Sequence, residues 1–306
     1  MSVKAWIVVG DQPAISNLIT VARSLGPESG TVAAVVAGSR AVAETVAASG
    51  VDRVVWCGGP EGSPAEASAA AAADAVAADP APVVLSARNP GDRVLLGAVA
   101  AKLGAAVLTG ARSVSVAGGT AKVVNAVYGD ISDETVEVSG PVALLMDGGS
   151  VPQASGEAVP VEEAAGTPYG VTVVETITSE FEQVDLNAAH RVVGVGRGLR
   201  AQEDLALIES LAAALKAEVA CSRPVAEGLN WMGKDRYIGS SGARISPQLY
   251  LAIGISGQLQ HMVGVVGAET IVAINSDPNA AVFGQADYGL VGDLYDLVGE
   301  ITKAIG

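Results

Sequence analysis

The strongest constraint on the fold is a regular alternation of short, continuous apolar runs with stretches of helical composition. In the first part of the chain the apolar runs cover residues 5–9, 32–36, 53–57 and 82–86. Strands that are apolar without interruption are typical of a parallel sheet whose two faces are both covered by helices. The intervening segments that we predict as helices are residues 15–25, 40–49, 64–78 and 92–103. We therefore predict an α/β fold with a mainly parallel sheet.

The middle of the chain has a different pattern. Residues 113–116, 121–128 and 135–146 are β-like and are separated by glycine-containing turns, with no helical stretch between them. This succession favours an antiparallel or meandering arrangement. Residues 151–170 are rich in Pro, Gly, Ala and Glu, so we expect an extended connector there. Residues 171–177 are predicted to add one more strand.

The alternation of strands and helices restarts after the polar segment 181–187. A chain of 306 residues has room for about two domains. We predict an N-terminal α/β domain at 1–186 and a second domain, with its own mainly parallel sheet, at 187–306. The strands predicted in the second domain are 190–195, 217–220, 251–253 and 270–274, and the helices are 204–215, 258–263 and 291–304.

The segment from Tyr250 to Asp277 reads as a strand, a tight glycine turn, a short helix and a second strand. Such a unit presents backbone N–H groups and the positive end of a helix at its turn. The segment therefore predicts a site for an anion such as a nucleotide phosphate. The alternative is that Gly254 and Gly257 only make a tight turn.

Charge is unevenly distributed along the chain. The net charge is −15, which argues against nucleic acid as a partner. Residues 1–186 hold 9 basic and 21 acidic side chains, or −12, whereas residues 187–306 hold 9 and 12, or −3. Eight of the nine bases in the second part lie between Arg191 and Arg244. This cluster suggests a bound anion of limited size; the alternative is chance clustering on a solvated face.

Other features narrow the class of protein. The longest apolar runs are too short for a membrane span, and the N-terminal segment does not resemble a signal peptide, so we expect a cytoplasmic protein. Cys57 and Cys221 are far apart in the sequence and have no metal-type spacing. With His190 and His261 as the only histidines, we expect no metal site.

Several candidate ligand contacts follow strands of the second domain. The segment 194–199 resembles a dinucleotide fingerprint, but Leu199 stands where that pattern needs glycine, so we expect no standard NAD site. Arg197 and Arg223 each follow a strand, and ligands of parallel sheets bind at the carboxyl ends of strands. The alternative for Arg223 is a surface ion pair with a nearby carboxylate.

His261 is the candidate with the most specific chemistry, because it lies in the helix that starts at the glycine turn. A histidine beside a redox ring can carry a charge and stabilise an anionic reduced state. The alternative is a histidine that only packs on a helix face. The sequence has no nucleophile elbow, no P-loop and no arrangement of a catalytic triad. Phosphate-binding features without acid–base groups favour a bound redox cofactor over hydrolysis.

Three motifs follow one another in the second domain. They are P-x-L-Y-x-A-x-G-I-S-G-x-x-Q-H at 247–261, T-I-V-A-I-N-x-D-P at 270–278 and F-x-x-A-D-Y-G-x-V-G-D-L at 283–294. Together with 196–198 and 222–223, they closely resemble the alpha subunit of electron-transfer flavoproteins, a family that includes the FixB proteins. The N-terminal part resembles this family only weakly, at 91–93 and 102–104.

This resemblance implies a Rossmann-like second domain that binds FAD non-covalently and a first domain that contacts a smaller beta subunit. It also implies that the chain is an electron carrier, as one half of a heterodimer, and not an enzyme with its own substrate. The residues that match FAD contacts of the family are Arg197, Ser222, Arg223, Ile238, Gly239, Ser240, Ser241, Ser256, Gly257, Gln258, Leu259, Gln260, His261, Asn275, Asp293 and Leu294.

Three of these residues match positions around the flavin ring. The resemblance places Arg223 over the ring, the hydroxyl of Ser241 near N5, and His261 near the N1–O2 edge, where it would stabilise an anionic, partly reduced flavin. The loop 239–242 reads G-S-S-G where the family usually has G-Q-T-G. A Val-Asp pair usually follows the arginine, but the stretch after Arg223 reads Pro-Val-Ala-Glu. In the motif at 254–261, Gln258-Leu259 replaces the usual Ala-Ile. These departures leave the redox potential and the electron partner open.

The expected role is transfer of electrons from a flavin dehydrogenase, of the type that acts on acyl-CoA, to another redox protein. Two alternatives belong to other classes. One is a self-contained flavin or nicotinamide oxidoreductase, which would turn over NADH without a partner. The other is a nucleotide-binding paralogue without redox function.

Overall fold

The fold is taken from a computed structural model, which describes residues 2–25, 30–59, 62–129, 132–164, 171, 174–175, 184, 186 and 189–305. The chain divides into two compact units, Met1–Thr176 and Ile177–Gly306. The predicted boundary at 186/187 falls later, in a stretch of which only a few residues are described. Of the strand predicted at 171–177, residues 171, 174 and 175 are described and none is in a strand; the others lie outside the described residues.

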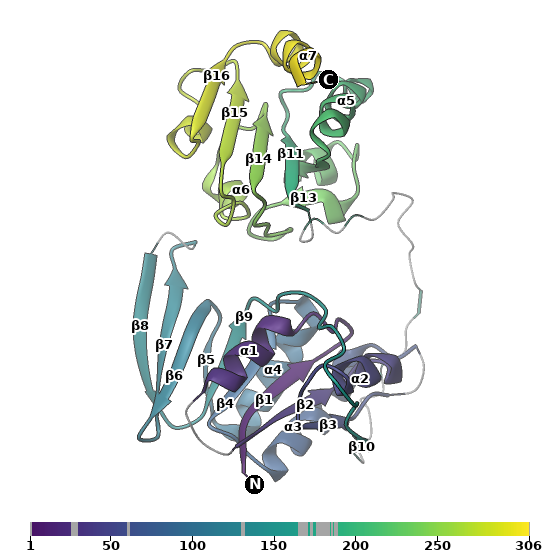
Figure 1. Cartoon of the computed structure of the whole chain (residues 1–306), viewed down its shortest axis with the longest axis vertical. Helices are drawn as coiled ribbons and strands as arrows, with labels where there is room; N and C mark the ends of the chain where they lie inside the picture. Colours follow the sequence, from purple (N-terminus) through teal and green to yellow (C-terminus); the bar gives the residue numbers. More distant parts are fainter. Residues whose placement is uncertain are drawn as a thin grey trace. The chain divides into compact units, whose positions relative to one another are not determined.

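Unit 1 is organised around a parallel sheet of seven strands, which confirms the predicted α/β class (Figure 1). The strand order is β10-β3-β2-β1-β4-β9-β5, and every neighbouring pair is parallel. The central strands are buried almost throughout because helices cover both faces. The strands are β1 (Val3–Val9), β2 (Thr31–Val36), β3 (Arg53–Trp56), β4 (Val83–Ala87), β5 (Ala106–Leu108), β9 (Val142–Met146) and β10 (Val161–Glu163).

The two faces of this sheet carry different cores. On one face, α1 (Ser16–Ser24) and α2 (Arg40–Ala47) pack with the antiparallel sheet of β6 (Ala111–Ala117), β7 (Thr120–Val127) and β8 (Ser132–Ser139). The other face is covered by η1 (Ala65–Ser68), α3 (Ala69–Ala78) and α4 (Pro90–Leu103). Five of the ten residues of the alanine-rich α3 are buried, and their small side chains let the helix lie close to the sheet.

Two predictions for the middle of the chain need correction. The β-like stretch 135–146 is not one antiparallel element, because it divides at Gly140-Pro141 into β8 and the parallel strand β9. All five residues of β9 are buried, as expected for a strand covered on both faces. The expected connector also contributes strand β10, whose Glu162 pairs with Arg53 at 2.8 Å and whose Glu163 pairs with Arg40 at 2.7 Å.

Asp92 is a buried carboxylate in the first turn of α4. Its oxygens accept hydrogen bonds from the backbone N–H of Gly10 at 2.7 Å and from the side chain of Asn89 at 3.1 Å. Burial raises the pKa of Asp92 to about 6, and these hydrogen bonds offset that shift only in part. Folding therefore stabilises the protonated form. The stability that the protonated Asp92 adds to the folded chain is fully present below the unfolded pKa of 3.8, and it is lost as the pH rises to about 6.

We predict that Asp92→Asn raises the free energy of unfolding of unit 1 at pH 7.5 by about 1–3 kcal/mol and has little effect below pH 4. The amide oxygen can still accept the Gly10 N–H, while the buried charge is removed. Urea unfolding at the two pH values measures the effect. Asp74→Asn on α3 is the matched control, since Asp74 loses only a surface ion pair with Lys102. A less stable Asp92→Asn variant at pH 7.5 would refute this account.

Unit 2 is built on a parallel sheet of six strands in the order β13-β12-β11-β14-β15-β16 (Figure 1). Numbered within the unit, this is the order 3-2-1-4-5-6 of doubly wound nucleotide-binding sheets, with its switch point between β11 and β14. The strands are β11 (Arg191–Val195), β12 (Glu218–Ser222), β13 (Tyr237–Ile238), β14 (Leu249–Ile253), β15 (Ile271–Asn275) and β16 (Tyr288–Val291).

The helices of unit 2 again cover both faces. One core contains residues of α5 (Leu205–Leu215), α7 (Leu294–Ile305) and η3 (Pro224–Gly228), which is a π-helix. The opposite core contains residues of α6 (Leu259–Met262) and η5 (Ala281–Gly284). Two further single turns are η2 (Gln202–Asp204) and η4 (Lys234–Arg236). Among the described residues, no helix is long and apolar enough to cross a membrane.

The end of unit 2 differs from the prediction. The last helix begins at Leu294, and the preceding residues 288–291 form the edge strand β16, which the sequence analysis missed. All four residues of β16 are exposed, so the strand lacks the buried apolar pattern that identified the others. The predicted strands at 190–195, 217–220, 251–253 and 270–274 correspond to β11, β12, β14 and β15.

Candidate functional site

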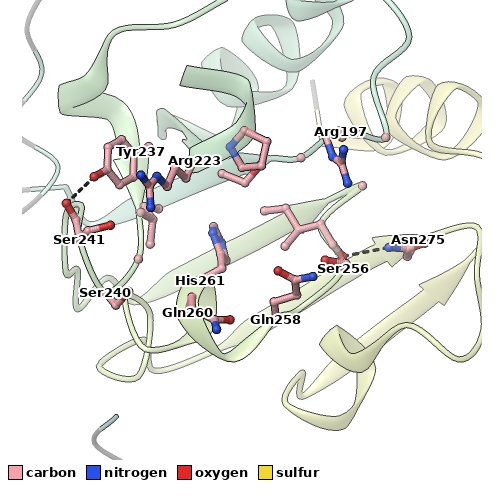
Figure 2. A pocket seen from close by; sticks show the side chains of 18 residues that line it. Arg197, Arg223, Tyr237, Ser240, Ser241, Ser256, Gln258, Gln260, His261 and Asn275 are labelled. Atoms are coloured by element: carbon pink, nitrogen blue, oxygen red, sulfur yellow. Dashed lines mark hydrogen bonds between the residues drawn. The ribbon is translucent and has the colours of Figure 1, made fainter. Parts of the chain in front are cut away.

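A pocket of about 490 Å³ opens at the carboxyl ends of β11, β12 and β14, beside the switch point of the sheet (Figure 2). Most of the predicted contacts lie together around it, although they come from five separate segments of the chain. The lining residues are Gly196, Arg197, Gly198, Ser222, Arg223, Pro224, Tyr237, Ile238, Gly239, Ser240, Ser241, Gly254, Ile255, Ser256, Gln258, Gln260, His261 and Asn275.

Close contact between two backbone segments forms one wall of the pocket. The N–H groups of Gly196 and Gly198 donate to Ile253 and Gly254 at 2.9 and 3.2 Å. Gly254 has a φ of +62°, and a Cβ there would lie 2.8 Å from the Cα of Gly198. Only glycine can adopt this positive φ and also fit this close to the neighbouring backbone without displacing it. These glycines therefore allow the backbones that follow β11 and β14 to approach closely at the switch point. Leu199 occupies the position where a dinucleotide fingerprint needs glycine, and its side chain packs in the core.

The loop 239–242 is tied to α6 by backbone hydrogen bonds. The N–H of Ser240 donates to the carbonyl of Gln260 at 2.7 Å, and the N–H of Gly239 donates to Ala243 at 3.1 Å. The hydroxyl of Tyr237 donates to the carbonyl of Ser241. The loop is therefore ordered by its backbone and by Tyr237, so its position does not depend on the side chain of Ser240.

Two arginines bring positive charge to the pocket, whereas none of the lining residues that the structure describes is acidic. Figure 2 shows Arg197 and Arg223 on one side of the space and Gln258, Gln260 and His261 across it. Arg223 forms an ion pair with Glu227, four residues later, at 2.5 Å, and this hydrogen bond raises the pKa of Arg223. The surface ion pair that the sequence analysis gave as the alternative is thus present, and Arg223 nevertheless lines the pocket.

His261 lines the pocket but is largely buried, with only 8% of its surface exposed. Its Nε2 lies 2.7 Å from the hydroxyl of Tyr250, and its Nδ1 is buried without a hydrogen-bond partner among the described residues. Burial lowers the pKa of His261 to about 4, and the backbone of Ile238 offsets this only in part. The imidazole of the chain alone is therefore neutral at pH 7. Its expected charge beside a bound redox ring stays a prediction.

The turn after β14 is held by a side chain of the neighbouring strand. The amide of Asn275, the last residue of β15, donates to the carbonyl of Ile255 at 2.9 Å. Val282 of η5 donates its N–H to the carbonyl of Ser256 at 3.1 Å. The turn therefore presents Ser256 to the pocket from a fixed backbone.

Four predicted contacts lie outside the pocket lining: Gly257, Leu259, Asp293 and Leu294. Leu259 is 48% exposed, and Leu294 is buried in the core beneath α7. Asp293 forms an ion pair with Arg200 at 2.9 Å and accepts the N–H of Tyr295 at 2.8 Å. Gly257 supports the turn with a φ of +80°.

Six pocket residues were not among the predicted contacts: Gly196, Gly198, Pro224, Tyr237, Gly254 and Ile255. All of them except Gly254 adjoin a predicted contact in the sequence, so adjacency was the available signal. In the structure, Gly242 leaves room for the ring of Tyr237, because a Cβ at this position would lie against that ring. As a whole, the pocket offers two positively charged side chains together with uncharged amide, imidazole and hydroxyl groups. These groups suit a ligand that combines a negative charge with a ring that accepts hydrogen bonds at its edge.

Comparison with known protein families gives two matches along the chain. Residues 12–169 match the electron transfer flavoprotein domain, and residues 185–266 match the electron transfer flavoprotein FAD-binding domain. The second match includes most of the pocket residues, from Gly196 to His261.

Two relatives from Escherichia coli match over more than two thirds of their own length. "Putative electron transfer flavoprotein subunit YdiR" of strain K12 is 44% identical over 228 residues, which cover 72% of this chain and 72% of that protein. "Protein FixB" of strain HS (O9:H4) is 44% identical over 218 residues, which cover 68% of this chain and 69% of that protein.

Proposed function

Since this chain belongs to the electron transfer flavoprotein family, as an alpha-type, FixB-like protein with an FAD-binding domain, we propose that it works as a heterodimer with a beta subunit. In this complex it carries electrons from a flavin dehydrogenase, of the type that acts on acyl-CoA, to another redox protein. The observation that carries the proposal is the pocket at the switch point. It has two arginines, and among the residues that the structure describes it has no acidic lining residue and no hydrogen-bond partner for His261 Nδ1.

The residues of the pocket fit FAD. A dianionic pyrophosphate needs cations and backbone N–H groups, which Arg197 and the turn residues 255–257 provide at the strand ends. A flavin ring has carbonyl and nitrogen acceptors along one edge, and the buried Nδ1 of His261 lacks a partner among the described residues. We propose that Arg197 binds the pyrophosphate and that Arg223, Ser241 and His261 surround the ring. When bound, the flavin supplies reversible electron storage.

The chain contributes binding, orientation and electrostatics. The charge of Arg223 favours a more negative ring, and Glu227 moderates that charge through its 2.5 Å ion pair. No acidic side chain lines the described pocket, so the site has no carboxylate to act as an acid or base on a substrate. This arrangement suits an electron carrier better than an oxidoreductase with its own substrate.

The test is electron transfer to the reconstituted complex. The chain is produced with an electron transfer flavoprotein beta subunit, loaded with FAD and mixed under anaerobic conditions with an acyl-CoA dehydrogenase and its substrate. We expect flavin bleaching only when dehydrogenase and substrate are both present, and none with NADH alone. Rapid reduction of the isolated alpha chain by NADH would contradict the proposal and support a self-contained oxidoreductase.

A further inference from the structure

Tyr250 and His261 form a buried pair directly below the pocket. Tyr250 lies on β14 with 0% of its surface exposed, and its hydroxyl is 2.7 Å from His261 Nε2. The two rings are tilted by 38°, with centroids 6.1 Å apart, so the contact joins the edges of the rings. Gly194 on β11 leaves room for this arrangement, because a Cβ there would overlap the Tyr250 hydroxyl.

The direction of this hydrogen bond follows from the other partners of the two groups. In the described part of the chain, His261 Nε2 is the only partner of the Tyr250 hydroxyl. If Nε2 carried the proton, it would donate to the phenol oxygen and leave the phenol O–H buried without an acceptor, at a cost of about 1–3 kcal/mol. If the phenol donates, the Tyr250 O–H and the His261 Nε2 are both satisfied, and Nε2 is the unprotonated acceptor. Burial also raises the pKa of Tyr250, so the phenol keeps its proton.

The proton of a neutral imidazole must then lie on Nδ1. That atom is buried and forms no hydrogen bond among the described residues, although the backbone of Ile238 lies close enough to the ring to raise its pKa. Figure 2 shows the His261 ring pointing from α6 toward the space between Arg223 and Gln258, both of which line the pocket. A ligand atom that accepts a hydrogen bond at this position would satisfy the last polar group of the pair.

We propose that Tyr250 is a positioning residue, whose O–H holds His261 in the tautomer with its proton on Nδ1 and thereby makes His261 an uncharged N–H donor toward the flavin ring. The proposal rests on the proposed function, since it takes the flavin as the acceptor. The low pKa of His261, about 4, is consistent with it, because only a neutral imidazole exists as two tautomers, of which the Tyr250 hydroxyl can favour one. A hydrogen bond to a ring oxygen strengthens as that oxygen gains negative charge, so this donor favours the reduced cofactor without carrying a charge itself.

The tautomer can be measured on the flavin-free chain. Because His190 and His261 are the only histidines, ¹⁵N-histidine labelling gives two ring systems, and His190→Asn assigns them. At pH 7.5 we expect the His261 Nδ1 signal to be of the protonated type and the Nε2 signal of the unprotonated type. In Tyr250→Phe we expect this preference to be lost or reversed. A protonated Nε2 in the wild type, or an unchanged tautomer in Tyr250→Phe, would overturn the proposal.

A second readout uses FAD itself. Tyr250→Phe keeps the aromatic ring and removes only the hydroxyl, so we expect a folded protein whose affinity for FAD falls by about tenfold through loss of one oriented hydrogen bond. We also expect a lower reduction potential of the bound flavin. An unchanged affinity together with an unchanged potential would overturn the proposal. If the wild-type chain fails to bind FAD while the tautomer depends on Tyr250, the proposed function fails and the positioning role stands.

Discussion

Replacing Gly257 by alanine should lower the affinity for FAD by more than about 100-fold, which is a loss of at least about 2.7 kcal/mol of binding free energy. Gly257 has a φ of +80°, and its Cβ would overlap the backbone nitrogen of Val282. That nitrogen donates to the carbonyl of Ser256 at 3.1 Å, so the added methyl group separates η5 from the turn. Ser256 and Gln258 flank Gly257 and line the pocket, and both would move.

The chain offers a matched control for this substitution. Gly119 in the turn between β6 and β7 also has a φ of +80°, but a Cβ there would meet no heavy atom within 4 Å. Alanine at this position costs only the backbone strain of about 1–2 kcal/mol. Titration of each FAD-free variant with FAD, followed by fluorescence, should show normal affinity for Gly119→Ala. Equal affinities of the two variants would show that the turn at Gly257 does not position the cofactor.

Arg197→Ala should weaken FAD binding by a factor of about 10 to 100, because a hydrogen bond to a charged group contributes about 1.5–3 kcal/mol. Arg197 lies just beyond the carboxyl end of β11 and lines the pocket. None of the described residues forms an ion pair with it, so its charge is available to a ligand. The remaining affinity should also depend less on salt concentration, since one cation is removed from the site.

Arg191→Ala is the control that changes the net charge by the same amount as Arg197→Ala. Arg191 begins the same strand at its opposite end and donates to the carbonyl of Leu215 at 2.8 Å. It has the same charge as Arg197 but does not line the pocket. We expect its affinity for FAD to stay within about twofold of the wild type. Similar losses in both variants would indicate a general effect of charge and would refute a specific contact at Arg197.

The sequence predicted the elements that position the site because their signals are local. The apolar runs at β11, β12 and β14 are continuous, and each is followed at once by glycine, serine or arginine. Since parallel strands end at the same edge of a sheet, strand prediction alone places Arg197, Ser222 and Ser256 near one another. The edge strand β16 gave no such signal, because its four residues are exposed.

The chemistry of the site depended on contacts that the sequence could not supply. The neutrality of His261 follows from its burial between β14 and α6, and its tautomer follows from the hydroxyl of Tyr250, eleven positions earlier in the motif. The ion pair of Arg223 with Glu227 needed the π-helical turn η3, which the sequence analysis did not predict. In unit 1, strand β10 is anchored by arginines more than a hundred residues away in the sequence.

The most direct test of the account is the FAD content of the chain purified together with its beta subunit. The complex is denatured, and the released cofactor is identified and quantified per alpha chain, for the wild type, Gly257→Ala and Gly119→Ala. The account predicts one FAD per alpha chain in the wild type and in Gly119→Ala, and a large loss in Gly257→Ala. A well-folded wild-type complex that contains no FAD and cannot be loaded with it would contradict the central claim that this pocket holds the flavin.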